Sequence, residues 1–509
     1  MKSLPRSFWI IASVILIING IQATFTELLQ DEAYYWYYAQ ELEWGYFDHP
    51  PFVAFLALTS RLFKDELGLR VLSVVLNLAS YLLVFLSLKE QTRQRQQFNF
   101  WLILLSLPLI NLYGFLTLPD TGTLFFASLF IYGYKAFLKE KPRAALLLGL
   151  AMAGLMYSKY TGVLLILATI ASNLSLLQNP KAWLAVGISL MLFAPHLGWL
   201  YTHDFITLKF HFSERPNHAY DFLNFTGLYF VNAIALFGLF AYAIFKSLFQ
   251  APTQEKFSRG LVFMTAGVLL FFFLSSFEKK SQLQWLLPAC YPALILLLER
   301  INKTSIYAFV KPLAAMSLLL LLGLRMLLIA PQWSPIRLET HGVSKWAKQV
   351  ASQASTSVVA FKDSYQKASL YAFYTGRPAL SFNTLGYRPN AYDFDARWAT
   401  LEGNPLTLID DKAKTFTRIE RFQHVSAQYF ESFNDVLKLH LSDSQKLYAA
   451  VLDEHKNPIA MVRIKTDANG EVLELSAQEE LLMGATSIRI GVQNEDHPIR
   501  LISLTSFHP

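Results

Sequence analysis

The sequence predicts a multi-spanning α-helical membrane protein of about eleven transmembrane helices, followed by a soluble α/β domain. Hydrophobic residues make up 53% of the 509 residues and charged residues only 16%, whereas about a quarter of the residues of a soluble protein are charged. Apolar runs of roughly 18 residues, long enough to cross a bilayer as a helix, recur through residues 1–330. After Pro331 they give way to the mixed composition of a soluble domain.

The first apolar run follows the basic residues Lys2 and Arg6. It lacks a clear small-residue cleavage site, so an uncleaved anchor is favoured over a signal peptide. The expected spans are residues 8–23, 69–88, 98–116, 121–138, 144–158, 161–177, 183–200, 226–249, 260–277, 284–300 and 306–330. Fusing 144–158 with 161–177 would invert the topology that follows. It would also bury Lys159 near the middle of an overlong helix, at a cost of about 3 kcal/mol.

Basic residues gather in every second connection between these spans. The positive-inside rule assigns those connections to the cytoplasm, so the net charge of +7 reflects topology rather than nucleic acid binding. The outer side then holds loops 24–68 and 201–225 and the short turns around Asp120 and Lys159. By the same count the C-terminal domain, residues 331–509, lies on the outer side and is periplasmic or extracellular.

Within residues 331–509, helices are expected at 344–351 and 365–375. Strands are expected at 357–361, 379–382, 406–409, 449–452, 459–464 and 499–504. Asp363 and Gln366 have the spacing of a capping box before the second helix, and Gly376 is placed to end it.

Two short helices are expected in loop 24–68. The segment 51–64 is apolar but too short to span, which is typical of a helix in the membrane interface. The segment 31–40 begins with Asp31 and Glu32, and negative charge is favoured at a helix N-terminus. The same carboxylates are suited to act as a general base toward an acceptor at the membrane surface. Spacing alone leaves both interpretations open.

Asp120 follows Pro119 in a tight turn between two apolar helices. It suits the N-cap of the second helix, or a second carboxylate facing the same cavity as Asp31. His49 lies in Asp48-His49-Pro50-Pro51, where two prolines fix the backbone. Its imidazole could contact a phosphate, although a turn and a helix start explain this pattern equally well.

Three basic residues on the outer side are candidates for neutralising a phosphate. Arg70 and Lys159 lie at helix ends, where snorkelling to the interface is the ordinary explanation. Arg215 lies in loop 201–225 with His211, Glu214 and His218. The spacing of these histidines matches no standard zinc motif, so no metal site is predicted.

Several function classes find no support. The sequence has no Gly-rich phosphate loop, no His-Glu-x-x-His motif and no nucleophile elbow, and its single cysteine, Cys290, excludes intramolecular disulfides. A transporter or flippase of lipid-linked sugars is the main alternative to an enzyme. Such proteins typically show repeated halves, and no repeat is seen here. A glycan-binding scaffold would leave the acidic loop unexplained.

Five short motifs follow one another through the membrane part. They are Asp-Glu-Ala-Tyr-Tyr-Trp from Asp31, Gly-Tyr-Phe-Asp-His-Pro-Pro from Gly45, Glu-Leu-Gly-Leu-Arg from Glu66, Leu-Pro-Asp-Thr from Leu118 and Ser-Lys-Tyr-Thr from Ser158. In this order they resemble the polyprenyl-phosphate-sugar glycosyltransferases of the GT-C class. The bacterial members related to protein O-mannosyltransferases and the lipid A aminoarabinose transferase are the most similar. The segment from Lys362 to Tyr374 resembles their outer C-terminal domain.

The resemblance implies a multi-pass enzyme of the inner membrane. It would transfer a hexose or pentose from polyprenyl (undecaprenyl) phosphate to a lipid, glycan or protein acceptor on the outer side, with inversion. The resemblance places the catalytic base at Asp31, with Glu32 in the same motif and Asp120 as a further carboxylate. No cofactor is required, although a divalent ion shared by Asp31, Asp120 and the donor phosphate is compatible with this arrangement.

The resemblance also suggests how the donor phosphate is held. Arg70 and Arg215 match basic positions of the family, and Lys159 and His49 are further candidates for the same task. The aminoarabinose transferases have lysine at the position of His49, which weakens any claim that aminoarabinose is the sugar.

Overall fold

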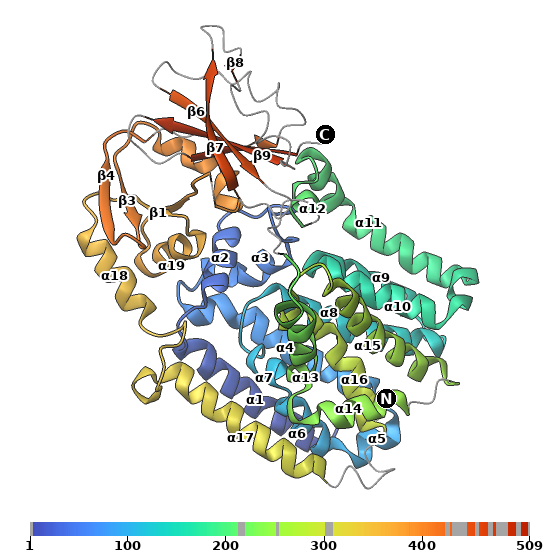
Figure 1. Ribbon diagram of the computed structural model, residues 1–509. Helices are drawn as coiled ribbons and strands as arrows, with labels where there is room; N and C mark the ends of the chain where they lie inside the picture. Colours follow the sequence, from blue (N-terminus) through green and yellow to red (C-terminus); the bar gives the residue numbers. More distant parts are fainter. Residues whose placement is uncertain are drawn as a thin grey trace. The chain divides into compact units, whose positions relative to one another are not determined.

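The computed structural model describes residues 4–211, 219–250, 254–300, 309–385, 387–422, 428–429, 445–452, 458–466, 472–474, 487–494 and 500–506 (Figure 1). The chain forms two compact units. The first contains Met1–Gly45, His49–Trp199 and Tyr220–His341. The second contains Tyr46–Asp48, Leu200–Ala219 and Gly342–Pro509. Residues 331–341, which follow the last apolar helix, therefore pack with the first unit.

The first unit is built almost entirely from helices. They are α1 (Arg6–Phe25), α2 (Gln30–Ala39), α3 (Phe52–Leu56), η1 (Ala57–Arg61), α4 (Glu66–Ser87), α5 (Glu90–Arg95), α6 (Gln97–Ser106), α7 (Pro108–Leu112), α8 (Pro119–Leu138), α9 (Ala144–Ser158), η2 (Tyr160–Gly162), α10 (Val163–Ser172), η3 (Leu174–Gln178), α11 (Pro180–Thr202), η5 (Leu223–Gly227), α13 (Leu228–Phe237), η6 (Gly238–Phe240), α14 (Ala241–Phe249), α15 (Lys256–Ser275), η7 (Leu283–Ala289), α16 (Cys290–Leu298) and α17 (Val310–Ile329).

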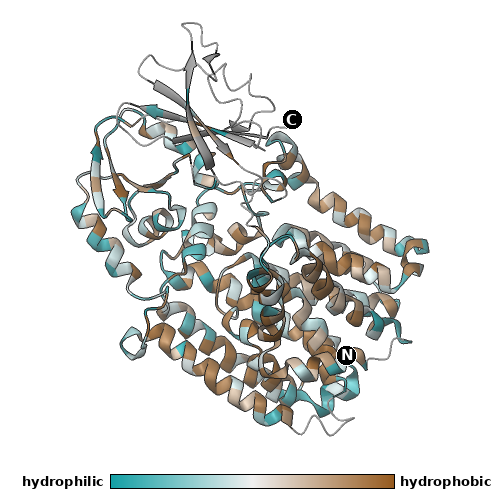
Figure 2. Cartoon of the chain, in the orientation of Figure 1, coloured by the Kyte–Doolittle hydropathy of each residue, from teal (hydrophilic) through white to brown (hydrophobic). Residues whose placement is uncertain are grey.

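Among the described residues, six helical segments are long and apolar enough to cross a membrane. They are Arg6–Phe25, Glu66–Ser87, Pro180–Thr202, Leu223–Phe249, Lys256–Ser275 and Val310–Ile329. Figure 2 shows the hydrophobic residues along these helices in brown. The other five predicted spans do not meet this criterion. One coincides with α8 and one with α9. The remaining three coincide with interrupted helical segments, which are α6 followed by α7, α10 with its flanking 3-10 turns, and η7 followed by α16. The multi-spanning helical class is confirmed, and the count of eleven spans stays a prediction.

Loop 24–68 contains both predicted short helices, with one difference. Helix α2 covers the predicted segment 31–40, as its acidic first turn indicates. The predicted interfacial helix 51–64 is instead divided into α3 and the 3-10 segment η1. In η1 the Thr59 hydroxyl donates to the carbonyl of Gly68 at 2.5 Å, which holds the segment against the first turn of α4. Leu62 and Phe63 follow it with exposed apolar side chains.

Helix α8 packs closely against α9, and two glycines allow the close approach. A Cβ at Gly154 of α9 would lie 2.2 Å from the ring of Phe126 in α8. A Cβ at Gly122 of α8 would lie 2.6 Å from the Ser158 hydroxyl and 2.5 Å from the ring of Phe52. Only hydrogen fits at these two positions. The C-terminal end of α9 therefore lies next to the N-terminal turn of α8.

The second unit contains α12 (Ile206–Lys209) and, after Gly342, begins as an α/β structure. Helices α18 (Val343–Gln353) and α19 (Tyr365–Thr375) accompany a sheet of order β2-β1-β3-β4. Its strands are β1 (Val359–Lys362), β2 (Ala379–Phe382), β3 (Leu406–Asp410) and β4 (Thr415–Ile419). Strand β1 pairs in parallel with β2 and β3, whereas β4 is antiparallel to β3. The predicted helices and first three strands are confirmed, and β4 was missed.

The predicted cap of α19 is wrong by one residue. Ser364 is the N-cap, and its hydroxyl accepts from the backbone N of Lys367 at 3.3 Å. Asp363 instead adopts a left-handed conformation, with φ of 53°. Its carboxylate accepts from the backbone N and the hydroxyl of Thr384, both at 2.8 Å. Gly376, with φ of 66°, ends the helix as predicted.

A second sheet, of order β5-β10-β9-β6-β7-β8, follows in the chain. Its strands are β5 (Gln428–Tyr429), β6 (Gln445–Leu452), β7 (Pro458–Thr466), β8 (Val472–Glu474), β9 (Ser487–Asn494) and β10 (Arg500–Ser506). All described pairs are antiparallel except β10 with β5. Leu385, Ala450 and Leu452 form a small buried cluster. Strands β6, β7 and β10 were predicted. Strand β9, which pairs with both β6 and β10, was not.

The contact at Gly154 gives a stability prediction. Gly154→Ala places a methyl group against the ring of Phe126, and overpacking of this kind typically costs about 1–3 kcal/mol. We expect a lower thermal unfolding midpoint of the detergent-solubilised protein. Gly187→Ala in α11 is the matched control, because a Cβ there meets nothing within 4 Å. Equal midpoints for the two variants would contradict the close approach of α8 and α9.

Candidate active site

Arg70 and Glu32 form a fully buried ion pair at the start of α2. Arg70 Nε and Nη2 donate to the two carboxylate oxygens of Glu32 at 2.8 Å and 2.5 Å, and both side chains have 0% exposure. Arg70 Nη1 also donates to the carbonyls of Ala23 and Thr26 at 3.0 Å and 2.6 Å. Glu32 accepts from the backbone N of Thr117 at 2.9 Å. The pair thus joins α1, α2, α4 and the segment before α8.

These contacts favour a structural role for both residues. The sequence offered Glu32 as a catalytic carboxylate and Arg70 as a ligand of the donor phosphate. In the structure the hydrogen-bonding groups of both side chains are occupied by protein partners away from solvent. A phosphate could reach Arg70 only by breaking a buried ion pair, which typically costs about 3–5 kcal/mol.

Asp31, next to Glu32 in the chain, has a different environment. It lies in the first turn of α2 and is exposed. Its charge and that of Asp120 both act on the hydroxyl of Tyr113, whose side chain is 9% exposed. That Asp31 and Asp120 face one cavity stays a prediction. Tyr113 was not identified from the sequence, because it lies in an apolar segment with no motif of its own.

Asp120 and Lys159 form a second ion pair. Lys159 Nζ lies 2.8 Å from Asp120 Oδ1, and the side chains are 15% and 6% exposed. Asp120 occupies the first turn of α8, and Lys159 is the extended residue that ends α9. Close packing of α8 on α9 at Gly122 brings these two ends together. Two residues predicted for the site are thus in direct contact, and the lysine keeps part of its surface accessible.

His49 is held by a tyrosine of α2. The hydroxyl of Tyr35 lies 3.1 Å from His49 Nε2, and the two rings meet edge to face with centroids 5.4 Å apart. Tyr35 is four residues after Asp31, and residues at this spacing share one face of a helix. The same face of α2 therefore carries Asp31 and the tyrosine that holds His49. The four-residue spacing from Asp31 is the signal in the sequence that points to Tyr35.

The part of loop 24–68 just before His49, residues 43–45, is fixed against α11. Trp199 Nε1 donates to Glu43 at 2.7 Å, and the ring of Trp199 leaves no room for a Cβ at Gly45. The buried imidazole of His196 lies 2.5 Å from the carbonyl of Trp44 and 2.8 Å from the hydroxyl of Tyr160. Tyr160 follows Lys159 directly. His196 therefore ties the first outer loop to the segment that presents Lys159.

The next three residues, Tyr46–Asp48, belong to the second unit. The Thr207 hydroxyl donates to the carbonyl of Tyr46 at 2.8 Å, and His211 Nε2 lies 3.0 Å from the carbonyl of Asp48. The Asp48 carboxylate pairs with Arg388 Nη2 at 2.9 Å. The motif that contains His49 is therefore continuous in sequence but divided between the two units. Arg215, Glu214 and His218 lie outside the described residues.

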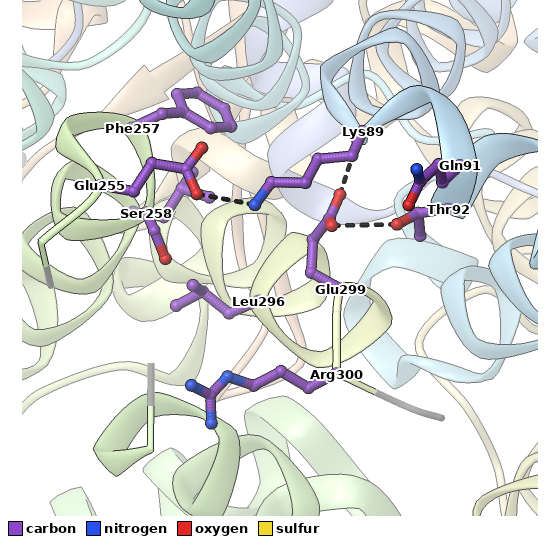
Figure 3. A pocket seen from close by; sticks show the side chains of 10 residues that line it. Lys89, Gln91, Thr92, Glu255, Phe257, Ser258, Leu296, Glu299 and Arg300 are labelled. Atoms are coloured by element: carbon purple, nitrogen blue, oxygen red, sulfur yellow. Dashed lines mark hydrogen bonds and ion pairs between the residues drawn. The ribbon is translucent and has the colours of Figure 1, made fainter. Parts of the chain in front are cut away.

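A cavity of about 260 Å³ lies at the opposite end of α4 from Arg70 (Figure 3). Arg70 lies 17 residues before Ser87, the last residue of α4, so the helix separates the two places by roughly 25 Å. The charged groups that line the cavity bind one another. Lys89 Nζ pairs with Glu255 at 2.6 Å, and Glu299 accepts from the backbone N of Lys89 and the hydroxyl of Thr92 at 2.6 Å and 2.9 Å. These bonds connect helix ends on the basic side of the chain, and the cavity is not part of the candidate site.

Comparisons with known proteins agree with the motifs. Residues 48–199 match the dolichyl-phosphate-mannose-protein mannosyltransferase family. The lipid A galacturonosyltransferase RgtD of Rhizobium johnstonii is 24% identical over 313 residues, which are 57% of this chain and 65% of RgtD. The match thus spans slightly less than two thirds of that relative.

Solved structures of ArnT from Cupriavidus metallidurans share the fold. The apo structure gives a TM-score of 0.61 at 13% identity, covering 79% of this chain and 93% of ArnT. The structure bound to undecaprenyl phosphate gives 0.58 at 15% identity, covering 83% and 97%. The chain has the GT-C fold, and its resemblance to the GT-C polyprenyl-phosphate-sugar glycosyltransferases is confirmed.

The ion pair of Glu32 gives a prediction that separates structure from catalysis. Glu32→Ala leaves Arg70 buried without its counter-charge, so we expect a loss of about 3–5 kcal/mol of stability. The measurement is the thermal midpoint and folded yield in detergent, with Glu41→Ala in the exposed part of the loop as the control. The double variant Glu32→Ala/Arg70→Met should recover part of the loss. A native midpoint with lost activity would instead support a catalytic Glu32.

Proposed function

We propose that this protein is a membrane glycosyltransferase. It moves a sugar from polyprenyl phosphate to a lipid acceptor at the outer face of the inner membrane, and Asp31 is its general base. The observation that carries the proposal is the group of side chains around α2. Asp31 is exposed on the face of α2 that also holds His49 through Tyr35. Further along the same loop, His196 ties Trp44 to Tyr160, which follows Lys159, and Lys159 is paired with Asp120.

The relatives support this choice of substrates. ArnT, which shares the fold, has been solved with undecaprenyl phosphate bound, and RgtD is a lipid A galacturonosyltransferase. One relative thus binds a polyprenyl phosphate, and the other is named for the transfer of a sugar to a lipid. The apolar helices of the first unit suit such a donor, because its polyprenyl chain would stay in the bilayer while its phosphate reaches the loops.

The proposed reaction needs a base and a way to stabilise the leaving group. Asp31 takes the proton from the acceptor hydroxyl as its oxygen attacks the anomeric carbon. The bond between that carbon and the phosphate oxygen breaks, and polyprenyl phosphate leaves with the bonding electron pair. Attack from the face opposite the phosphate inverts the anomeric centre. The bond to the leaving phosphate is exchanged for the bond to the acceptor oxygen, so the reaction consumes no nucleotide.

Lys159 and His49 are the described candidates for the phosphate. Lys159 is partly accessible and is oriented by Asp120, so a positive charge is held at the surface of the site. His49 is positioned by Tyr35. Preorganised donors of this kind stabilise the developing charge on a leaving group. Arg215 remains a third proposed phosphate ligand. Arg70, by contrast, is proposed to hold α2 in place.

Asp31→Asn is expected to abolish transfer without unfolding the protein, because Asp31 is exposed and its amide analogue has the same shape. Loss of a general base typically lowers the rate about 10²- to 10⁴-fold. The measurement is mass spectrometry of envelope lipids from cells that express the native chain or the variant, looking for one added hexose- or pentose-sized unit. Glu41→Gln, an exposed carboxylate of the same loop, is the control. Native levels of modified lipid in Asp31→Asn would rule out this role.

The proposal also places the C-terminal domain on the outer side. Cys290 is buried, so single cysteines can be introduced into the native chain and labelled without interference. In right-side-out membranes, Ser352→Cys in α18 should react with a membrane-impermeant maleimide. Gln94→Cys, in a connection expected to be cytoplasmic, should react only after permeabilisation. Both positions are exposed. The reverse pattern of labelling would overturn the topology.

A further inference from the structure

Helix α2, which carries Asp31, begins without a capping side chain of its own. Leu29 occupies the N-cap position and has no polar side-chain atom. The first N–H groups of a helix have no partner within it and must find one elsewhere. Glu32 accepts from the backbone N of Leu29 at 3.2 Å, but its oxygens otherwise serve Arg70 and Thr117. The N–H of Gln30, the first helical residue, needs another acceptor.

Glu339 supplies that acceptor from 309 positions further along the chain. Its Oε1 accepts a hydrogen bond from the backbone N of Gln30 at 2.6 Å. A carboxylate at this end of a helix also interacts favourably with the helix dipole. Glu339 belongs to residues 331–341, which connect α17 to the second unit and pack with the first. The residue next to the proposed base is thus tied to a segment that the sequence did not connect with the site.

The end of this connection is itself fixed to α17. His341 Nε2 lies 2.8 Å from the carbonyl of Leu327 in the last turn of α17, and its Nδ1 accepts from the backbone N of Leu338 at 3.2 Å. Both bonds form together when Nε2 carries the proton and Nδ1 does not. The histidine is 6% exposed. Glu339 lies between Leu338 and His341 in the chain, so these bonds hold its backbone against α17.

Glu339 also brings a third carboxylate to the start of α2. Desolvation raises the pKa of Glu339, the bond from Gln30 lowers it, and the charges of Asp31 and Glu32 raise it again. The negative charges of Glu339 and Asp31 therefore interact at the start of α2. The other charged or titratable groups in the segments around this helix start are Glu27, Arg337, Tyr113 and the ion pairs Glu32–Arg70 and Asp120–Lys159.

We propose that Glu339 is a positioning residue for sugar transfer. It fixes the first turn of α2 through the hydrogen bond from Gln30, and it places a negative charge beside Asp31. The inference rests on the proposed function, because it assumes that Asp31 is the base. It assigns a role in that site to the connection between α17 and the second unit.

Two variants separate the two parts of this role. Glu339→Gln keeps an oxygen that can accept from Gln30 but removes the charge, whereas Glu339→Leu removes both. A first readout does not depend on activity. Carbodiimides modify protonated carboxyl groups, so at a fixed, mildly acidic pH the rate at which Asp31 is labelled follows its protonated fraction. We expect Glu339→Gln to slow the labelling of Asp31, mapped by mass spectrometry, roughly two- to tenfold.

The second readout is the pH profile of sugar transfer by the purified, lipid-reconstituted protein. Glu339→Gln should move the acidic limb of kcat/KM to lower pH, because Asp31 loses its proton more easily, and should lower kcat at neutral pH. Glu339→Leu should lower kcat further, because the first turn of α2 is no longer fixed. Glu41→Gln should leave both readouts unchanged.

Native labelling of Asp31 together with a native pH profile in Glu339→Gln would overturn the proposal. Asp31→Asn is assayed alongside to separate this outcome from failure of the proposed function. If Asp31→Asn abolishes transfer while the Glu339 variants behave as native, only the role of Glu339 falls. If Asp31→Asn retains transfer, the role of Asp31 as base is wrong, and the role of Glu339 falls with it.

Discussion

The ion pair between Glu32 and Arg70 is the interaction on which the arrangement of the candidate site depends. Both side chains are fully buried, and taking two charges out of water costs several kcal/mol for each ion. Their mutual attraction offsets this cost only if their remaining hydrogen-bonding groups are also satisfied. The carbonyls of Ala23 and Thr26 and the N–H of Thr117 meet that condition. A shift of α2 relative to α1, α4 or the start of α8 would leave buried charge unsatisfied, so the pair fixes the place of α2 among these segments.

A second buried guanidinium extends the polar core of the first unit. Arg325 of α17 donates to the side chain of Asn19 at 2.8 Å and to the carbonyl of Asn111 at 2.5 Å. The centroid of the Phe115 ring lies 5.0 Å from Arg325 Cζ and 5.7 Å from Arg70 Cζ. Cation–π attraction to this ring offsets part of the cost of burying both cations. These contacts join α17 to α1. Both helices are connected to the first turn of α2. Helix α1 precedes α2 in the chain, and α17 is followed by Glu339, which accepts a hydrogen bond from Gln30. The polar core and the proposed cap therefore act on the same few residues.

The sequence predicted the helices and strands of this fold better than the contacts that residues make between them. Helices α2 and α19 were found because each carries its own signal, an acidic first turn in one and Gly376 after the other. The ion pairs of the site join residues 38 and 39 positions apart, and hydropathy carries no information on such pairings. Glu32 and Arg70 were therefore predicted as separate members of the site, without the ion pair that joins them. The same limit applies to Tyr46–Asp48, because a motif that is continuous in sequence gives no sign that its residues pack into two units.

Adjacent carboxylates in α2 have different surroundings because of helix geometry. Consecutive residues of an α-helix are rotated by about 100°, so Asp31 and Glu32 cannot face the same surroundings. Glu32 faces the polar core, where accepting a proton would break a buried ion pair. Asp31 is exposed at the surface, as the base that we propose must be to meet an acceptor. Its backbone is nevertheless held on both sides, by Glu32 after it and by the bond from Gln30 to Glu339 before it. If Asp31 is the base that we propose, its fixed backbone orients it without the loss of hydration that burial would impose. This combination would suit a site that admits the proposed lipid-borne acceptor from the membrane surface.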